Sequence, residues 1–138
     1  NEEDVMASAM LYVSADLATY DEDWLLVAGS THGSGAEFGG EFDKGSGTLD
    51  GFVTKLVLPI SGVPPSSVST SSRLYSVGDD GKEKDLYVIA MCANQDGDVT
   101  DFFVVGSTGE VKENKMKAFV AKMDVTTLKN VWSKELGA

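Results

Sequence analysis

The sequence predicts an all-β fold in which two tandem copies each contribute four antiparallel strands. Four short blocks of the 138-residue chain occur twice in the same order, a pattern that chance does not readily produce. The blocks are rich in Val, Leu, Phe, Tyr and Thr, residues that suit a pleated, half-buried surface. Gly, Asp, Ser or Pro residues bound them, as is typical of turns. We therefore expect a duplicated sheet-forming unit.

The strands are placed by the repeated blocks. The first copy is expected to hold them at residues 11–13, 24–31, 51–56 and 74–76. The second copy is expected to repeat them at residues 86–88, 102–108, 118–123 and 131–133. In the third strand Phe52 and Leu56 alternate with Val53 and Lys55. Apolar residues on both faces of one strand predict a sheet that is stacked between two layers.

The connections and the one helix-like segment fit the same scheme. The Asp96-Gly97 dipeptide is typical of a tight hairpin turn. Length differences between the copies fall at residues 32–50 and 59–72, where insertions are tolerated in loops. Residues 113–123 have some helical propensity, but the second half of this stretch aligns with a strand of the first copy. We therefore expect a strand at residues 117–124.

The motifs of both copies resemble a known repeat. The second copy reads DLYV at 85–88, DGD at 96–98, FVVGST at 103–108, AFVAKMD at 118–124 and VWSKELG at 131–137. The first copy reads LVAGST at 26–31 and DGFVTKL at 50–56. This pattern is similar to the SBBP β-propeller repeat, whose blades carry an acidic turn, aromatic-Val-x-Gly-Ser-Thr, Asp-Ala-Phe-Val-x-Lys-Leu-Asp and Trp-Ser-x-x-Leu-Gly.

The resemblance implies two four-stranded antiparallel propeller blades, one at residues 1–78 and one at residues 79–138. Because a propeller typically holds about 4 to 8 blades, two blades would form part of a larger ring or assembly. Further blades or self-association of the chain into a homo-oligomer would then cover the blade faces and strand edges. Repeats of this kind usually occur in extracellular or cell-surface proteins, so the resemblance also favours that location.

Composition narrows the classes of partner. The chain carries 11 Lys and Arg against 22 Asp and Glu, a net charge of −11, which disfavours nucleic acids and anionic membrane surfaces. No apolar stretch approaches the roughly 20 residues that span a bilayer, so membrane insertion is not expected. Cys92 is the only cysteine, which excludes an intrachain disulfide, and its apolar run predicts burial.

Three aspartates are candidate ligands for a metal ion: Asp96, Asp98 and Asp101. Ca²⁺ prefers six or more oxygen ligands, and carboxylates supply them. The spacing does not fit an EF-hand loop, and acidic hairpin turns also occur without metal. Calcium therefore stays one of two interpretations, and no other cofactor is expected.

Candidate contact residues come from the two long loops of the first copy: His32, Glu37, Phe38, Asp43, Pro64 and Pro65. Residues 33–40 are rich in glycine but do not match a dinucleotide-binding loop, because Phe38 stands at the third glycine position and no βαβ unit follows. A lone histidine without a nucleophile in a recognisable elbow does not make a catalytic triad. Contact with a partner is the interpretation that these loops favour.

The function expected from the sequence is a non-catalytic binding or scaffolding module that mediates protein–protein or surface interactions. Every repeated residue has a packing explanation, and no catalytic set remains. Three alternatives stay open: an accessory structural subunit of a large assembly, a fragment of a propeller enzyme, and a carbohydrate-binding propeller lectin. The lectin would use aromatic residues that otherwise pack between blades: Tyr12, Trp24, Tyr87 and Trp132.

Overall fold

The chain folds into two antiparallel β-sheets in a computed structural model that describes residues 5–14, 22–32, 48–58, 70–77, 81–93, 99–109 and 115–137. The strands are β1 (Val5–Val13), β2 (Asp23–Thr31), β3 (Asp50–Leu58), β4 (Thr70–Leu74), β5 (Ser76–Val77), β6 (Glu83–Lys84), β7 (Leu86–Cys92), β8 (Asp101–Thr108), β9 (Lys117–Asp124) and β10 (Asn130–Leu136). The described residues form no helix, and hence none long enough to cross a membrane. The predicted all-β, antiparallel fold is confirmed, as is the strand at residues 117–124.

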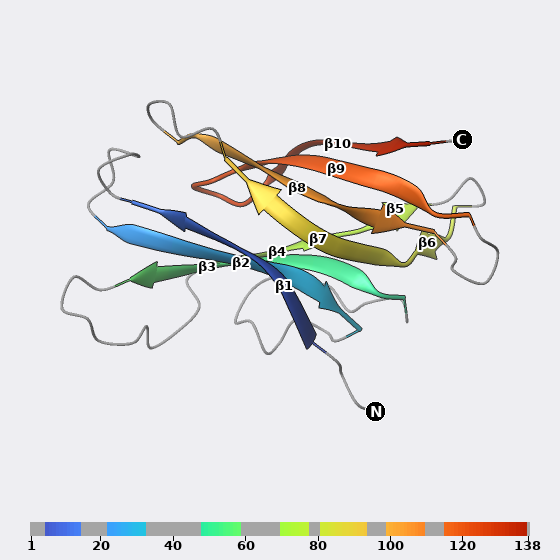
Figure 1. Ribbon diagram of the computed structural model, residues 1–138, viewed down its shortest axis with the longest axis horizontal. Helices are drawn as coiled ribbons and strands as arrows, with labels where there is room; N and C mark the ends of the chain where they lie inside the picture. Colours follow the sequence, from blue (N-terminus) through green and yellow to red (C-terminus); the bar gives the residue numbers. More distant parts are fainter. Residues whose placement is uncertain are drawn as a thin grey trace.

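Each four-stranded sheet is a simple meander. The first sheet has the order β1-β2-β3-β4, and the second has the order β7-β8-β9-β10. Every strand pairs antiparallel with its neighbour in the sequence. A short β5–β6 hairpin lies between the two meanders along the chain. Figure 1 shows the second sheet lying across the first, with β7 over β1, β2 and β3.

The strand pairing of the two sheets has the same irregularity at equivalent positions. In the first sheet Gly29 lies opposite Ala7, and the register then shifts by a one-residue bulge. In the second sheet Gly106 lies opposite Val88, and the same bulge follows. A Cβ at Gly29 would lie 1.9 Å from the backbone oxygen of Met6, and a Cβ at Gly106 would lie 2.0 Å from that of Tyr87. Only glycine fits such close backbone approaches, so these two positions are equivalent.

The pairing also corrects part of the expected alignment. The second and third blocks are equivalent as predicted, because Gly29 pairs with Phe52 and Gly106 pairs with Phe119. The first block is not: Leu86 occupies the position of Val5 rather than that of Leu11. The fourth block is also out of register, since the residue opposite Gly51 is Leu74 and the residue opposite Ala118 is Leu136. Short apolar triplets carry too little information to fix the register.

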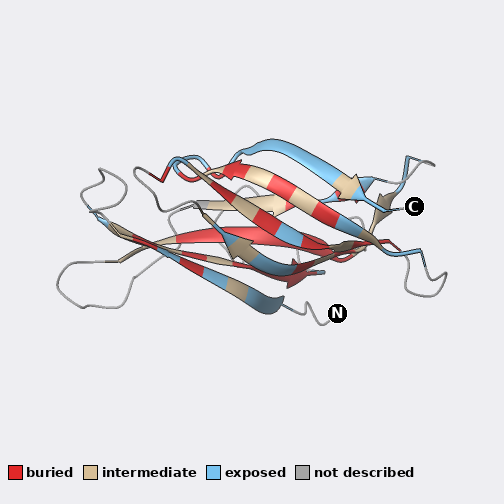
Figure 2. Cartoon of the chain, turned by 45° about the horizontal axis from the view of Figure 1, so that its top comes forward, coloured by how far each residue is buried: buried red, intermediate tan, exposed pale blue. Residues whose placement is uncertain are grey.

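The main hydrophobic core lies between the two sheets. The face of each sheet that borders this core is called its inner face, and the opposite face is called its outer face. Figure 2 shows buried residues alternating with more exposed ones along the strands, as the two-residue period of a strand requires. The first sheet contributes Leu11, Val13, Trp24, Leu26, Ala28, Val53 and Leu74 to this core. The second sheet contributes Leu86, Val88, Phe102, Val104, Phe119, Ala121 and Met123.

Equivalent residues of the two sheets point in opposite directions relative to this core. In β3 the residues on the inner face are Gly51, Val53 and Lys55. Their equivalents in β9 alternate with the buried positions and lie on the outer face: Ala118, Val120 and Lys122. Conversely, Phe119 is in the core, whereas its equivalent Phe52 lies on the opposite side of its own strand. The sheets therefore stack head to tail, so that each outer face is equivalent to the other sheet's inner face.

Polar contacts hold this stacking in one position. The Val88 N–H donates to Ser30 Oγ at 2.9 Å, and Ser8 Oγ donates to the Val88 carbonyl at 2.6 Å. Lys55 Nζ donates to the Thr126 carbonyl at 2.7 Å. Because unpaired polar groups are costly inside a core, these bonds oppose any sliding of one sheet over the other.

Cys92 departs from its predicted burial. It lies on the outer face of the second sheet and is exposed. Its equivalent in β1 is Leu11, which is in the core. An apolar run predicts burial of each of its residues, but β7 is buried on one face only.

Candidate functional site

Most of the loop residues singled out in the sequence lie outside the residues that the structure describes: Glu37, Phe38, Asp43, Pro64, Pro65, Asp96 and Asp98. His32 is described, and it is exposed immediately after the end of β2. The structure therefore places only one of the six predicted contact residues, and contact through these loops stays a prediction.

Asp101 is the one predicted calcium ligand that the structure describes. It begins β8, where its Oδ2 lies 3.6 Å from Lys122 Nζ and accepts a hydrogen bond of 3.2 Å from Thr100 Oγ1. Within the described ranges no three His, Cys, Asp or Glu side chains gather in a way that could hold a metal ion. The calcium site stays a prediction.

The four repeated aromatic residues do not share one surface. Trp24 is buried in the core, with Lys55 Nζ 4.1 Å from its ring centroid. Tyr12 is exposed on the outer face of the first sheet, where its hydroxyl donates to Asp23. Trp132 is exposed on the outer face of the second sheet, 6.3 Å from the ring of Phe103. Core packing is therefore confirmed for Trp24, whereas Tyr12, Trp132 and the half-buried Tyr87 lie outside the core between the two sheets.

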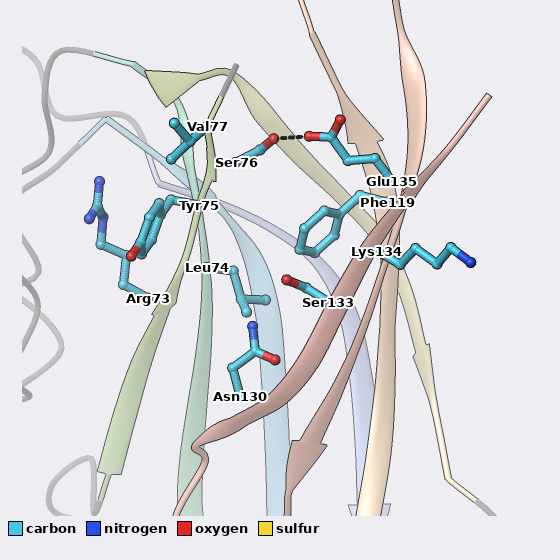
Figure 3. A pocket seen from close by; sticks show the side chains of 10 residues that line it. All are labelled: Arg73, Leu74, Tyr75, Ser76, Val77, Phe119, Asn130, Ser133, Lys134 and Glu135. Carbon is cyan, nitrogen blue, oxygen red and sulfur yellow. Dashed lines mark hydrogen bonds between the residues drawn. The ribbon is translucent and has the colours of Figure 1, made fainter. Parts of the chain in front are cut away.

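A cavity of about 420 Å³ lies where the β4–β5 segment meets β9 and β10 (Figure 3). Its lining is Arg73, Leu74, Tyr75, Ser76, Val77, Phe119, Asn130, Ser133, Lys134 and Glu135. Ser76 Oγ donates to Glu135 Oε1, and Lys117 Nζ lies 3.9 Å from the other carboxylate oxygen of Glu135. Figure 3 shows this bond at one end of the cavity, with Arg73 beside the Tyr75 ring at the side. The arrangement ties β5 to β10, and hence the two halves of the chain.

Arg73 belongs to a second polar cluster. Its Nε donates to Asp50 Oδ2 at 2.8 Å, its terminal nitrogen donates to Glu83 Oε2 at 2.7 Å, and its guanidinium lies 4.6 Å from the Tyr75 ring centroid. Asp50 is fully buried. Burial raises the pKa of the Asp50 carboxyl, and the Arg73 hydrogen bond only partly opposes this rise. The cluster holds β3, β4 and β6 together.

These pKa shifts predict opposite effects of pH for two aspartates. Because the folded pKa of Asp50 is above 3.8, its protonation stabilises the fold fully at low pH, and this contribution is lost as pH rises. The pKa of Asp124 is lowered, first by the Thr127 N–H bond and also by that of Thr126. Its contribution is therefore present above pH 3.8 and is lost as pH falls.

Urea unfolding of Asp50→Asn, Asp124→Asn and the unmodified chain from about pH 2 to 7 tests this pair. The stability of the unmodified chain minus that of Asp50→Asn is expected to fall as pH rises. The same difference for Asp124→Asn is expected to grow. Two differences that change in the same direction would contradict the assignment.

The outer faces of the two sheets carry several of the exposed apolar side chains of the described surface. On the second sheet the exposed apolar side chains are Ile89, Val105, Val131, Trp132 and Leu136, at 58%, 36%, 55%, 45% and 47% exposure. The pairing places Val105, Trp132 and Leu136 on the outer face. On the first sheet they gather on β1: Val5, Met10 and Tyr12, at 44%, 67% and 49%. Exposed apolar surface of this kind marks interaction sites. The two outer faces are therefore the best candidate for a functional surface.

The sequence did not identify these surfaces. Misalignment of the first and fourth blocks placed Tyr12 and Trp132 in the core and hid the equivalence of Leu11 with Cys92. The Arg73 cluster was also missed, because it joins residues that lie far apart in the chain and belong to no repeated block. The glycine pair Gly29 and Gly106 aligns β2 with β8, but it does not reveal which residues of β1 and β7 lie opposite them.

Comparisons of the chain with protein-family models, with curated proteins and with solved structures found no match.

Proposed function

We propose that the chain is a non-catalytic scaffolding module made of two propeller-type blades that binds protein through its outer sheet faces. The observation that carries this proposal is the head-to-tail stacking of the two sheets. In a propeller, blades are repeated around an axis, so the front of one blade packs on the back of the next. Of two equivalent residues in neighbouring blades, one then faces the shared core and the other faces away from it. Val53 and Val120 are such a pair.

The connectivity supports the same proposal. A blade is a four-stranded antiparallel meander, and both sheets have this order. A sandwich related by a two-fold axis would bury equivalent faces against each other, which would place Val53 and Val120 in the same core. The inverted faces instead favour repetition about an axis. Within the described residues, Met10 on the outer face of β1 and Val105 on the outer face of β8 are exposed, whereas Phe52 on the outer face of β3 is buried.

The exposed parts of the outer faces suit the chain to binding another protein. Val105 on the outer face of β8 is equivalent to Ala28, which is fully buried between the sheets. The outer face of the second sheet thus has the residue pattern of a surface that packs against another sheet. Carbohydrate binding is less well supported, because two of the exposed aromatic residues, Tyr12 and Trp132, lie on opposite outer faces and do not form one platform.

A photo-crosslinking amino acid at position 105, in the cells that produce the protein, tests this proposal. The same group at Lys129, which is exposed between β9 and β10, is the matched control. Position 105 is expected to give an adduct with a polypeptide, and position 129 is not. Failure of position 105 to crosslink above the level of position 129 would contradict binding through this face.

A further inference from the structure

The outer faces of the two sheets carry residues equivalent to the two sides of the internal sheet–sheet interface. The outer face of the second sheet carries the equivalents of residues that, in the first sheet, pack against β7. The outer face of the first sheet carries the equivalents of residues that, in the second sheet, pack against β1, β2 and β3. The chain thus contains one buried sheet–sheet interface and carries the equivalents of both halves of a second one. On the described part of the first sheet only β1 is exposed on this face, since Phe52 and Thr54 of β3 are already buried.

We infer that copies of this chain associate head to tail, with β1 of one copy lying across the outer faces of β7, β8 and β9 of the next. This inference rests on the proposed function, because it uses the same faces, and it names a second copy of the chain as the partner. Within the chain, β7 lies across β1, β2 and β3. Since β1 is the equivalent of β7, the intermolecular contact repeats the intramolecular one.

The residues of β1 fit this role. Val5, Ala7 and Met10 are the equivalents of Leu86, Val88 and Met91, which pack in or against the core. All three β1 residues are exposed within the single chain. The exposed apolar surface of the first sheet is thus concentrated on the strand that the inferred contact requires.

The outer face of the second sheet also has the hydrogen-bonding serine of the internal interface. Ser30 Oγ accepts the Val88 N–H across the internal interface at 2.9 Å. The equivalent of Ser30 is Ser107 on the outer face, and the equivalent of Val88 is Ala7. The head-to-tail contact would therefore place the Ala7 N–H of one copy at Ser107 Oγ of the next.

The two interfaces differ most in polarity at the position of Trp24. The stacked pair of Trp24 and Lys55 in the internal interface is replaced by Asp101 and Lys122 on the outer face. Asp101 and Lys122 already pair with each other at 3.6 Å, so the contact would cover a neutral pair rather than a lone charge. Covering an ion pair stabilises less than covering apolar surface. We therefore expect this interface to be weaker than the internal one.

The inferred contact joins two different faces and is therefore heterologous. Such heterologous contacts continue from copy to copy and end in a closed ring, or in a filament if the rotation does not close. A ring of about 4 to 8 blades would take about two to four copies of this two-blade chain. A two-fold dimer, by contrast, would use the same face on both copies.

Complementation between two variants tests the inference. Val105→Glu places a charge on the outer face of β8, and Met10→Glu places one on the outer face of β1. Each is expected to weaken self-association at least about 100-fold, because a lone charge would be buried in the contact. Each variant alone should sediment as a 14.6 kDa monomer at concentrations where the unmodified chain assembles. An equimolar mixture should form a one-to-one heterodimer through the two intact faces.

The native thiol gives a second measurement. Cys92 lies on the outer face that the contact covers, so its alkylation should slow as the unmodified chain is concentrated and should not slow in either variant. Lys129→Glu, which changes an exposed residue away from both faces, is the control and should assemble like the unmodified chain. Circular dichroism verifies that each variant retains its sheets.

Three outcomes would overturn the inference: an unmodified chain that stays monomeric when concentrated, a variant that dimerises alone, or a mixture of the variants that stays monomeric. The proposed function can survive any of these. A crosslink from position 105 to a different protein, together with a monomeric chain, would leave the scaffolding proposal standing and reject self-association.

Discussion

Replacement of Gly106 with alanine is expected to destabilise the chain by about 3 kcal/mol or more. The new Cβ would lie 2.0 Å from the Tyr87 carbonyl oxygen and 3.1 Å from the Val88 Cα, and both are backbone atoms. A backbone obstacle cannot rotate away as a side chain can, so β7 would have to separate from β8 at the bulge. Gly29→Ala is expected to have an effect of similar size, because a Cβ there would lie 1.9 Å from the Met6 oxygen.

Urea denaturation monitored by circular dichroism measures this effect. The neighbouring substitution Ser107→Ala, which adds no atom, is the matched control and is expected to change stability by less than about 0.5 kcal/mol. A Gly106→Ala protein as stable as the control would show that the bulge does not have the close approach described above.

Truncation of Phe102 to alanine is expected to cost about 4 kcal/mol, since the ring is fully buried between the sheets. Its neighbour Phe103 provides a sharp control. Phe103 is half-buried on the outer face of the same strand, beside Trp132, and its truncation is expected to cost about 1 kcal/mol. The two substitutions remove the same atoms from adjacent positions, so their difference reports which face of β8 forms the core.

Differences in the denaturation midpoint at unchanged slope give both values. Equal losses for Phe102→Ala and Phe103→Ala would contradict the assignment of inner and outer faces. A larger loss for Phe103→Ala would reverse it.

The all-β fold could be predicted from local signals in the sequence. The Gly-Ser-Thr ends of β2 and β8 and the shared Phe-Val-x-Lys pattern of β3 and β9 fixed the register of these strands. No comparable signal marks the outer strands of the meanders. In β1 and β7 a bulge adds a residue and reverses which side chains face the core beyond it, so triplets that look alike, such as 11–13 and 86–88, are not equivalent.

The candidate surfaces could not be predicted in the same way. Exposure of Cys92 and burial of its equivalent Leu11 depend on which face of each sheet meets the other, and a strand that is apolar on both faces does not reveal this. The buried Asp50–Arg73 pair likewise depends on the pairing of β3 with β4, which joins residues 23 positions apart. Alternation within a strand identifies two faces but does not say which is covered.

Head-to-tail stacking places one residue of each equivalent pair in the core and the other on an outer face, as for Leu11 and Cys92. Thiol accessibility at these two positions therefore tests the stacking. The experiment compares alkylation of the native Cys92 with that of Leu11→Cys in a Cys92→Ala chain, both folded and dilute enough to be monomeric. We expect Cys92 to react as an exposed thiol and the thiol at position 11 to react only when the chain opens. Equal reactivity of the two thiols, or faster reaction at position 11, would contradict head-to-tail stacking.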